Sequence, residues 1–201
     1  MSRFYGYGED FLTLLVLIKR IDEFLSELED KISSECYIYY RPSFGRAGGT
    51  EEKKSSQFGE FDAIVVNGGN AYLIESKWDG SSFEDNTLKL TDNQVHRHMV
   101  MEWYHENWSY NIWDDDKKAS EFESKFHKNV FPSERSKLRN NLDTIMNQIQ
   151  NKQIKHVILY ITKSGKIPIK EKYFLNDDEI KFEKVIIDYT QEPSNGNFIL
   201  L

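Results

Sequence analysis

The chain has 201 residues, of which 39% are hydrophobic, 14% aromatic and 29% charged. This length suits a single domain, and the share of apolar and aromatic residues is too high for a disordered chain. Its 26 Lys and Arg stand against 33 Asp and Glu, a net charge of -7. Because that charge repels polyanions on average, any nucleic-acid site must be a local basic patch. We expect one folded domain over residues 1–201.

The number of cysteines and the length of the apolar runs indicate in which cellular compartment the protein is expected. The single cysteine, Cys36, excludes a disulfide framework and a cysteine-rich zinc module, and we expect it to be a small buried residue. The longest apolar run, 11–18, falls short of the roughly 20 residues that a membrane span needs. Glu9 and Asp10 precede this run, where a secretory signal requires positive charge. These features predict a cytoplasmic protein with no membrane partner.

The periodicity of apolar residues predicts the order of helices and strands. Helical spacing predicts three helices, over 9–31, 88–108 and 135–150. Runs of β-branched and aromatic residues predict five strands, over 35–40, 60–66, 71–77, 155–162 and 181–189. The order is one helix, three strands, two helices and two strands. It indicates an α/β fold with a mixed central β-sheet flanked by helices.

Two polar segments lie between these elements. Residues 43–59 are rich in glycine, which allows close approach of the backbone to a ligand, and residues 109–133 look like an insertion with a lid or a short helix. From 125 to 139, five Lys and Arg stand against one Glu, so the net charge is 5 - 1 = +4. This stretch is either a phosphate-binding patch or an ordinary solvated face. Candidate nucleic-acid contacts nearer the first segment are Arg41, Arg46, Lys53 and Lys54.

The clearest hairpin places charged residues opposite one another. Asn67-Gly68-Gly69-Asn70 supplies the positive φ angles of a tight turn, so paired positions sum to 137 and Asp62 faces Glu75. The same register sets Glu60 against Lys77. Strand alternation then places these four charged side chains on one face. The other face receives Phe61, Ala63, Ile74 and Ser76.

Two opposed carboxylates need a compensating charge. Like charges directly across two strands destabilise a sheet, and Mg²⁺ prefers oxygen ligands of this kind. A bound divalent cation polarises a phosphoryl oxygen, while a neighbouring lysine orients the attacking water. This set of residues therefore favours phosphodiester hydrolysis. The alternative is a solvated hairpin face that carries charged residues for solubility.

Asp62, followed after twelve residues by Glu75-Ser76-Lys77, resembles the PD-(D/E)XK nuclease superfamily. The resemblance covers roughly 9–161 and implies a restriction-endonuclease-like core of order αβββαβ. It implies that Asp62 and Glu75 bind the metal and that Lys77 is the catalytic lysine. Glu9, at the start of the first helix, would complete the site.

The match departs from the family pattern at two points. Phe61 stands where the family name has proline. The helix acid rests only on its position: Glu23 or Glu27 could take the place of Glu9, and Glu9 could instead complement the helix dipole.

The helix over 88–108 carries further candidates. Gln94 lies where some members of the superfamily place a polar residue near the metal. The alternative is that Gln94 is an ordinary polar residue on the surface. Gln94 is not followed four residues later by the tyrosine that some relatives carry. The same helix has His98, Glu102 and His105 at spacings that could hold zinc, but the sequence shows no fourth ligand, and structural histidines are commoner.

These patterns predict a DNA endonuclease that uses Mg²⁺, with Mn²⁺ as a substitute. A type II restriction endonuclease is the most natural form, and we expect a homodimer because two active centres cut two strands. The alternatives are a structure-specific nuclease, such as a Holliday-junction resolvase or a repair enzyme, and a non-catalytic nucleic-acid-binding module.

Overall fold

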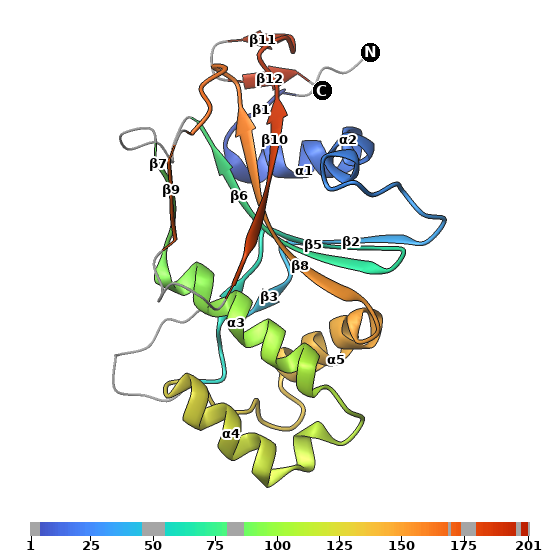
Figure 1. Cartoon of the computed structure of the whole chain (residues 1–201), viewed down its shortest axis with the longest axis vertical. Coiled ribbons are helices and arrows are strands. Elements are labelled where there is room, and N and C mark those ends of the chain that lie inside the picture. The colour runs from blue at the N-terminus through green and yellow to red at the C-terminus, as the bar shows by residue number, and fades with distance from the viewer. Residues whose placement is uncertain are drawn as a thin grey trace.

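The computed structural model describes residues 5–45, 55–79, 87–168, 170–173, 180–195 and 198–200. Its centre is a mixed five-stranded sheet with helices on both sides (Figure 1). The strand order is β10 (Phe182–Asp188), β8 (Gln153–Thr162), β6 (Asn70–Trp78), β5 (Ala63–Asn67) and β2 (Cys36–Tyr40). The predicted α/β class and mixed flanked sheet are confirmed.

Three of these strands form an antiparallel meander, and two run parallel to its last strand. β2 pairs with β5 and β5 with β6 in antiparallel fashion, whereas β8 runs parallel to both β6 and β10. The turn between β5 and β6 uses Gly68 at φ 54, a left-handed angle that favours glycine. Ala63 pairs with Ile74 and Asn67 with Asn70, which confirms the predicted register.

The helices cover the two faces of the sheet unequally. The first face carries α1 (Glu9–Lys19) and α2 (Ile21–Glu27), and the other carries α3 (Asp92–Asn107) and α5 (Lys137–Ile149), with α4 (Asp116–Phe126) packed against α3 (Figure 1). Two large apolar cores result. Alternate strand residues enter each: Ala63, Val65, Tyr72 and Ile74 on the α1 side, and Ile64, Val66, Ala71 and Leu73 on the α3 side.

Two predicted helices have different limits in the structure. The single helix expected over 9–31 is wrong, because the chain leaves helical geometry at Arg20 (φ -130) and helix α2 starts at the next residue. The guanidinium of Arg20 donates to Glu23 and to the carbonyl of Asp188, so packing against β10 accompanies the break. The start of the helix expected over 88–108 is also wrong. Residues 87–90 form strand β7 (Thr87–Leu90), paired with β9 (Lys170–Tyr173).

Several short elements were not predicted. The strands β1 (Tyr5–Gly6), β11 (Ser194–Asn195) and β12 (Phe198–Leu200) form a small separate sheet. Within the insertion expected over 109–133, a 3-10 turn, η1 (Ile112–Asp114), precedes α4. Cys36 is half-buried rather than buried. Across the described ranges, no helix combines the length and apolar character needed to cross a bilayer.

Candidate metal and nuclease site

Asp62, the residue before β5, lies near Glu75 at the far end of the hairpin, although the paired register of β5 and β6 ends at Ala63 and Ile74. The backbone N–H of Asp62 donates to the carbonyl of Ile74 at 3.2 Å. The Asp62 carboxylate in turn accepts a 2.7 Å hydrogen bond from the N–H of Ser76. Both acids therefore lie at one end of the hairpin, far from the turn at Asn67–Asn70.

The alternation expected before Asp62 is broken. Phe61 was expected on the face of Ala63, but it is fully buried in the core under α3. Glu60 was expected opposite Lys77, but it lies in β4 (Gly59–Glu60), which pairs with β3 (Ser43–Phe44) instead of β6. The bend between the two strands turns both side chains away from their expected positions.

Glu9 and Lys77 complete a charged cluster with the opposed acids. Burial raises the pKa of Glu9 to about 7. The positive charge of Lys77 lowers this pKa and the negative charge of Asp62 raises it, so Glu9 lies within electrostatic reach of both residues. The two alternative acids, Glu23 and Glu27, lie on α2 and away from this cluster. Glu23 accepts a hydrogen bond from Arg20, and Glu27 is exposed. Glu9 is the helix acid that the fold brings to this site.

The three carboxyl groups resist ionisation together. Burial raises the pKa of Asp62 to about 6, with further raising by Glu75, and burial raises the pKa of Glu75 to about 7. Lys77 acts in the lowering direction on all three acids. Arg97 acts in the same direction on Asp62 and Glu75, so two cations stand against three acids, and an additional cation would stabilise the ionised acids.

Helix α3 supplies direct partners for Glu75. Gln94 donates from Nε2 to Glu75 Oε2 at 2.9 Å, which places this candidate beside the cluster of acids rather than on an unrelated surface. Arg97, one turn further, brings Nη1 to 3.2 Å from Glu75 Oε1 and donates to the carbonyl of Glu60. Gly59 makes room for it, since a Cβ there would lie 3.3 Å from Arg97 Nε. Arg97 was missed, although it shares a helix face with Gln94 at i+3.

Two buried histidines lie behind Glu75. His98 Nε2 is 3.6 Å from Glu75 Oε1, and His98 Nδ1 is 2.8 Å from Nδ1 of His156 on β8. The zinc arrangement of His98 with Glu102 and His105 does not form, because the ring of His105 contacts the carbonyl of Ile149 at 3.1 Å. No signal in the sequence pairs His98 with His156.

The carboxylates of the cluster are suitable ligands for a hard cation, but they are not arranged as a complete metal site. In the described part of the chain, no group of three or more His, Cys, Asp and Glu side chains is arranged to hold a metal ion. Asp62 and Glu75 are instead turned toward protein donors at Ser76 and Gln94. Glu75 Oε1 is nevertheless buried without a hydrogen bond, although Arg97 Nη1 lies 3.2 Å from it. An orphaned carboxylate oxygen beside two further acids suits Mg²⁺, which binds oxygen.

The candidate nucleic-acid contacts are only partly described. Arg41 lies next to the site, where its guanidinium forms ion pairs with Asp10 and with Glu60. Arg46, Lys53 and Lys54 lie outside the described residues. In the basic stretch over 125–139, four side chains are exposed: Lys125, Lys128, Arg135 and Lys137.

The two polar segments meet at Asn129. Ser55, at the end of the glycine-rich segment, donates from its N–H to the carbonyl of Lys128 at 2.7 Å. The Asn129 amide donates to the carbonyls of Ser55 and Gln57, and its oxygen contacts His96 Nε2 on α3 at 2.6 Å. Helix α3 therefore connects the cluster of acids to both polar segments.

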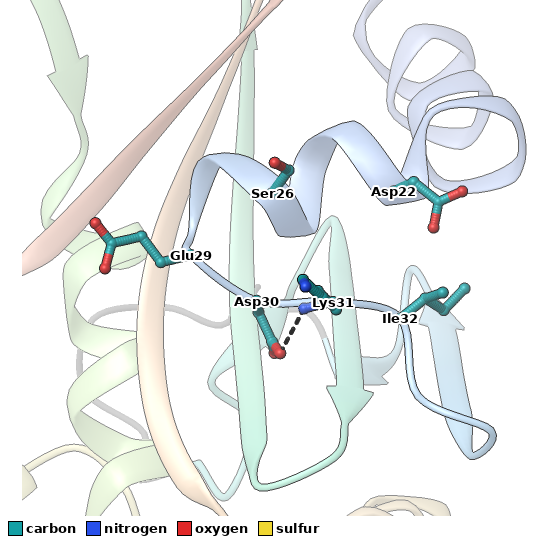
Figure 2. Close-up of a pocket in the computed structure, with 6 residues that line it drawn as sticks. All are labelled: Asp22, Ser26, Glu29, Asp30, Lys31 and Ile32. Atoms are coloured by element: carbon teal, nitrogen blue, oxygen red, sulfur yellow. Dashed lines mark hydrogen bonds between the residues drawn. The ribbon is translucent and has the colours of Figure 1, made fainter.

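A separate pocket of ≈ 330 Å³ lies at the end of α2 (Figure 2). Asp30 lines it, and its carboxylate accepts hydrogen bonds from Asn67, Asn70 and Tyr72 at the turn end of the hairpin. This pocket is thus at the opposite end of β5 and β6 from Asp62 and Glu75. Asp30 stabilises the hairpin from there and takes no part in the candidate site.

Comparisons of the chain with protein-family models, with curated proteins and with solved structures gave no match.

Proposed function

We propose that the protein is a Mg²⁺-dependent DNA endonuclease of the PD-(D/E)XK type that acts as a type II restriction endonuclease. The observation that carries the proposal is the placement of Asp62 near Glu75 at one end of a hairpin, with Lys77 and Glu9 within electrostatic reach. A buried acid, Glu75, with two half-buried acids and one amine near it is costly for the fold, and a catalytic site is a common reason to retain such a cluster.

The order of elements around the acids supports a restriction-endonuclease-like core. Helix α1 precedes the meander β2, β5 and β6, helix α3 follows it, and β8 lies parallel to β6. This is the sequence of helix, three strands, helix and strand that the resemblance implies. The additional strands and α4 are extensions of that core.

Each residue has a defined part in the proposed reaction. Asp62 and Glu75 would hold Mg²⁺, which when bound supplies charge to polarise a phosphoryl oxygen and to acidify a water. The Lys77 ammonium donates a hydrogen bond to the attacking water and stabilises the developing negative charge. The attacking water loses a proton to solvent as its oxygen bonds to phosphorus, one P–O ester bond breaks, and the departing oxygen takes a proton from solvent. Glu9 adds negative charge that strengthens cation binding.

The exposed cations of the α4–α5 region support a polyanionic substrate despite the net charge of -7. We propose that the active form is a homodimer, since two centres related by a twofold axis cut two antiparallel strands. Light scattering of the protein with and without DNA measures this, and a monomeric mass under both conditions contradicts it. We expect the protein to act in the cytoplasm.

The deciding experiment is incubation with plasmid and genomic DNA in Mg²⁺, with Glu75→Ala as the matched inactive control. We expect discrete fragments from the wild type and intact DNA from the variant. A smear or preferential cleavage of branched DNA would indicate a structure-specific or repair nuclease. Tight DNA binding that Asp62→Asn leaves unchanged, with no cleavage in Mg²⁺ or Mn²⁺, would indicate a non-catalytic binding module.

A further inference from the structure

A chain of buried polar groups runs from Glu75 into the protein behind the candidate site. His98 Nε2 lies 3.6 Å from Glu75 Oε1, and the two Nδ1 atoms of His98 and His156 lie 2.8 Å apart. His156 Nε2 then lies 3.5 Å from Glu102 Oε1. The rings of Phe61 and Phe182 pack against His98, which keeps the pair away from water.

The short contact between the two Nδ1 atoms restricts where the ring protons are. A hydrogen bond between two nitrogens contains one proton, so one ring donates and the other accepts. His98 is fully buried between the rings of Phe61 and Phe182, where a charged imidazolium is costly, so this ring carries a single N–H. If His98 is the donor, its Nε2 is a bare lone pair facing Glu75. If His156 is the donor, the proton of His98 is on Nε2 and faces Glu75.

The difference in burial between the two carboxylates favours the second arrangement. The Glu75 side chain is 1% exposed, whereas that of Glu102 is 37% exposed. A bound cation would keep Glu75 ionised, and a lone pair facing that carboxylate is costly where water cannot reach, whereas water can solvate the Glu102 end. The single N–H of His98 therefore stabilises the protein more when it is on Nε2, facing Glu75, than when it is on Nδ1, facing His156.

We propose that His156 is a positioning residue that sets the tautomer of His98, so that His98 Nε2–H donates to Glu75 and orients the carboxylate that binds the cation. This inference rests on the proposed metal role of Glu75. Gln94 holds one oxygen of that carboxylate and His98 and Arg97 approach the other, so one face of α3 contacts both oxygens of Glu75. Support of this kind behind a metal ligand affects the affinity for the metal without touching it.

The tautomer is directly measurable by ¹⁵N NMR of the histidine side chains in the Mg²⁺-loaded protein. The chain has five histidines, and the His98 signals are identified by their loss in His98→Gln. We expect a protonated Nε2 and an unprotonated Nδ1 for His98. The reverse pattern, with the proton on Nδ1, overturns the proposal.

A pair of substitutions at His156 tests the consequence for the cation. Asn places an amide donor near the position of Nδ1, whereas Leu fills the space without a donor. We expect calorimetry to show Mg²⁺ affinity reduced roughly tenfold or more in His156→Leu and nearly unchanged in His156→Asn, with both folded by circular dichroism. Equal affinities in the two variants overturn the proposal. If the two variants differ in Mg²⁺ affinity as expected but the wild type does not cleave DNA, only the proposed function is overturned. If the wild type does not bind Mg²⁺, both the proposed function and the proposed role of His156 are overturned.

Discussion

Gln94 joins the start of helix α3 to the buried acid Glu75. Its amide nitrogen donates to the Glu75 carboxylate at 2.9 Å, and its amide oxygen accepts from the backbone N–H of Thr91 at 3.0 Å. Thr91 reciprocates by accepting from the N–H of Gln94, which completes a capping box. One side chain thereby places the helix and orients the acid, so the helix start and the site geometry depend on each other.

Replacing Gln94 by Met removes the donor to Glu75 at similar side-chain size. We expect Mg²⁺ affinity and DNA cleavage to fall by roughly 10- to 100-fold, because the carboxylate loses a hydrogen bond that orients it. Calorimetry and a cleavage assay measure the two effects. Thr91→Ala is the matched control, since it weakens the same helix cap by about 1 kcal/mol and leaves the Glu75 contact in place. Equal losses in both variants would mean that the helix cap alone matters.

Replacing Lys77 by Met should abolish cleavage while DNA binding is retained. The ammonium orients the water and stabilises charge in the transition state, so we expect a loss of about 10²- to 10⁴-fold in the cleavage rate. A gel-shift assay in Ca²⁺ checks binding separately from cleavage. Lys152→Met is the control, because Lys152 bonds the carbonyl of Gly68 at the turn end of the hairpin. Full activity in Lys77→Met would remove the lysine from the mechanism.

The raised carboxyl pKa values predict a dependence of stability on pH. The folded pKa of Asp62 is about 6, above the value of about 4 in an unfolded chain, so the folded protein binds more protons between these values. The contribution of Asp62 to stability is present below pH of about 4 and is lost as pH rises through 6. We expect the melting temperature of Asp62→Asn to rise relative to wild type across this interval.

Mg²⁺ should reverse the same effect, because a bound cation stabilises the ionised acids. At pH above the folded value of about 6, we expect Mg²⁺ to raise the melting temperature of the wild type more than that of Asp62→Asn. Parallel melting curves for the two proteins at every pH, with and without Mg²⁺, would contradict both statements.

The far end of the hairpin offers a stability prediction that is independent of activity. Asp30 accepts hydrogen bonds from Asn67, Asn70 and Tyr72, so Asp30→Ala leaves three donors without their acceptor. We expect urea denaturation to show a loss of at least about 2 kcal/mol, with the cleavage rate of the folded protein unchanged. Asp22→Ala is the control, since exposed Asp22 lines the same pocket (Figure 2). A large loss of activity in folded Asp30→Ala would couple the two ends of the hairpin.

Several differences between the predicted and observed fold have a common origin. Periodicity predicted a continuous helix through Arg20, but contact of that side chain with β10 accompanies a break in the helix. Strand alternation predicted Phe61 on the α1 side, but its ring is buried under α3 after the bend from β4 into β5. In each case a contact between distant segments outweighed a local pattern.

The residues nearest Glu75 were predicted with unequal success. Asp62 and Lys77 follow from the hairpin register, and the position of Gln94 was anticipated from the superfamily resemblance. The contacts of Arg97 and His156 with this region involve helix α3 and strand β8, which are far apart in the chain. Neither residue has a spacing relative to Glu75 that marks it in the sequence.

The sequence by itself determined the tight turn at Asn67–Asn70, the pairing of β5 with β6 and hence the placement of Asp62 and Glu75 at the same end of the hairpin. These follow from turn chemistry and a strand period of two, which act between close neighbours in the chain. Only the tertiary structure decided which side of α3 meets Glu75 and that His98 meets His156. Those contacts depend on how whole elements pack, and packing minimises exposed apolar area over the entire chain rather than within any one segment.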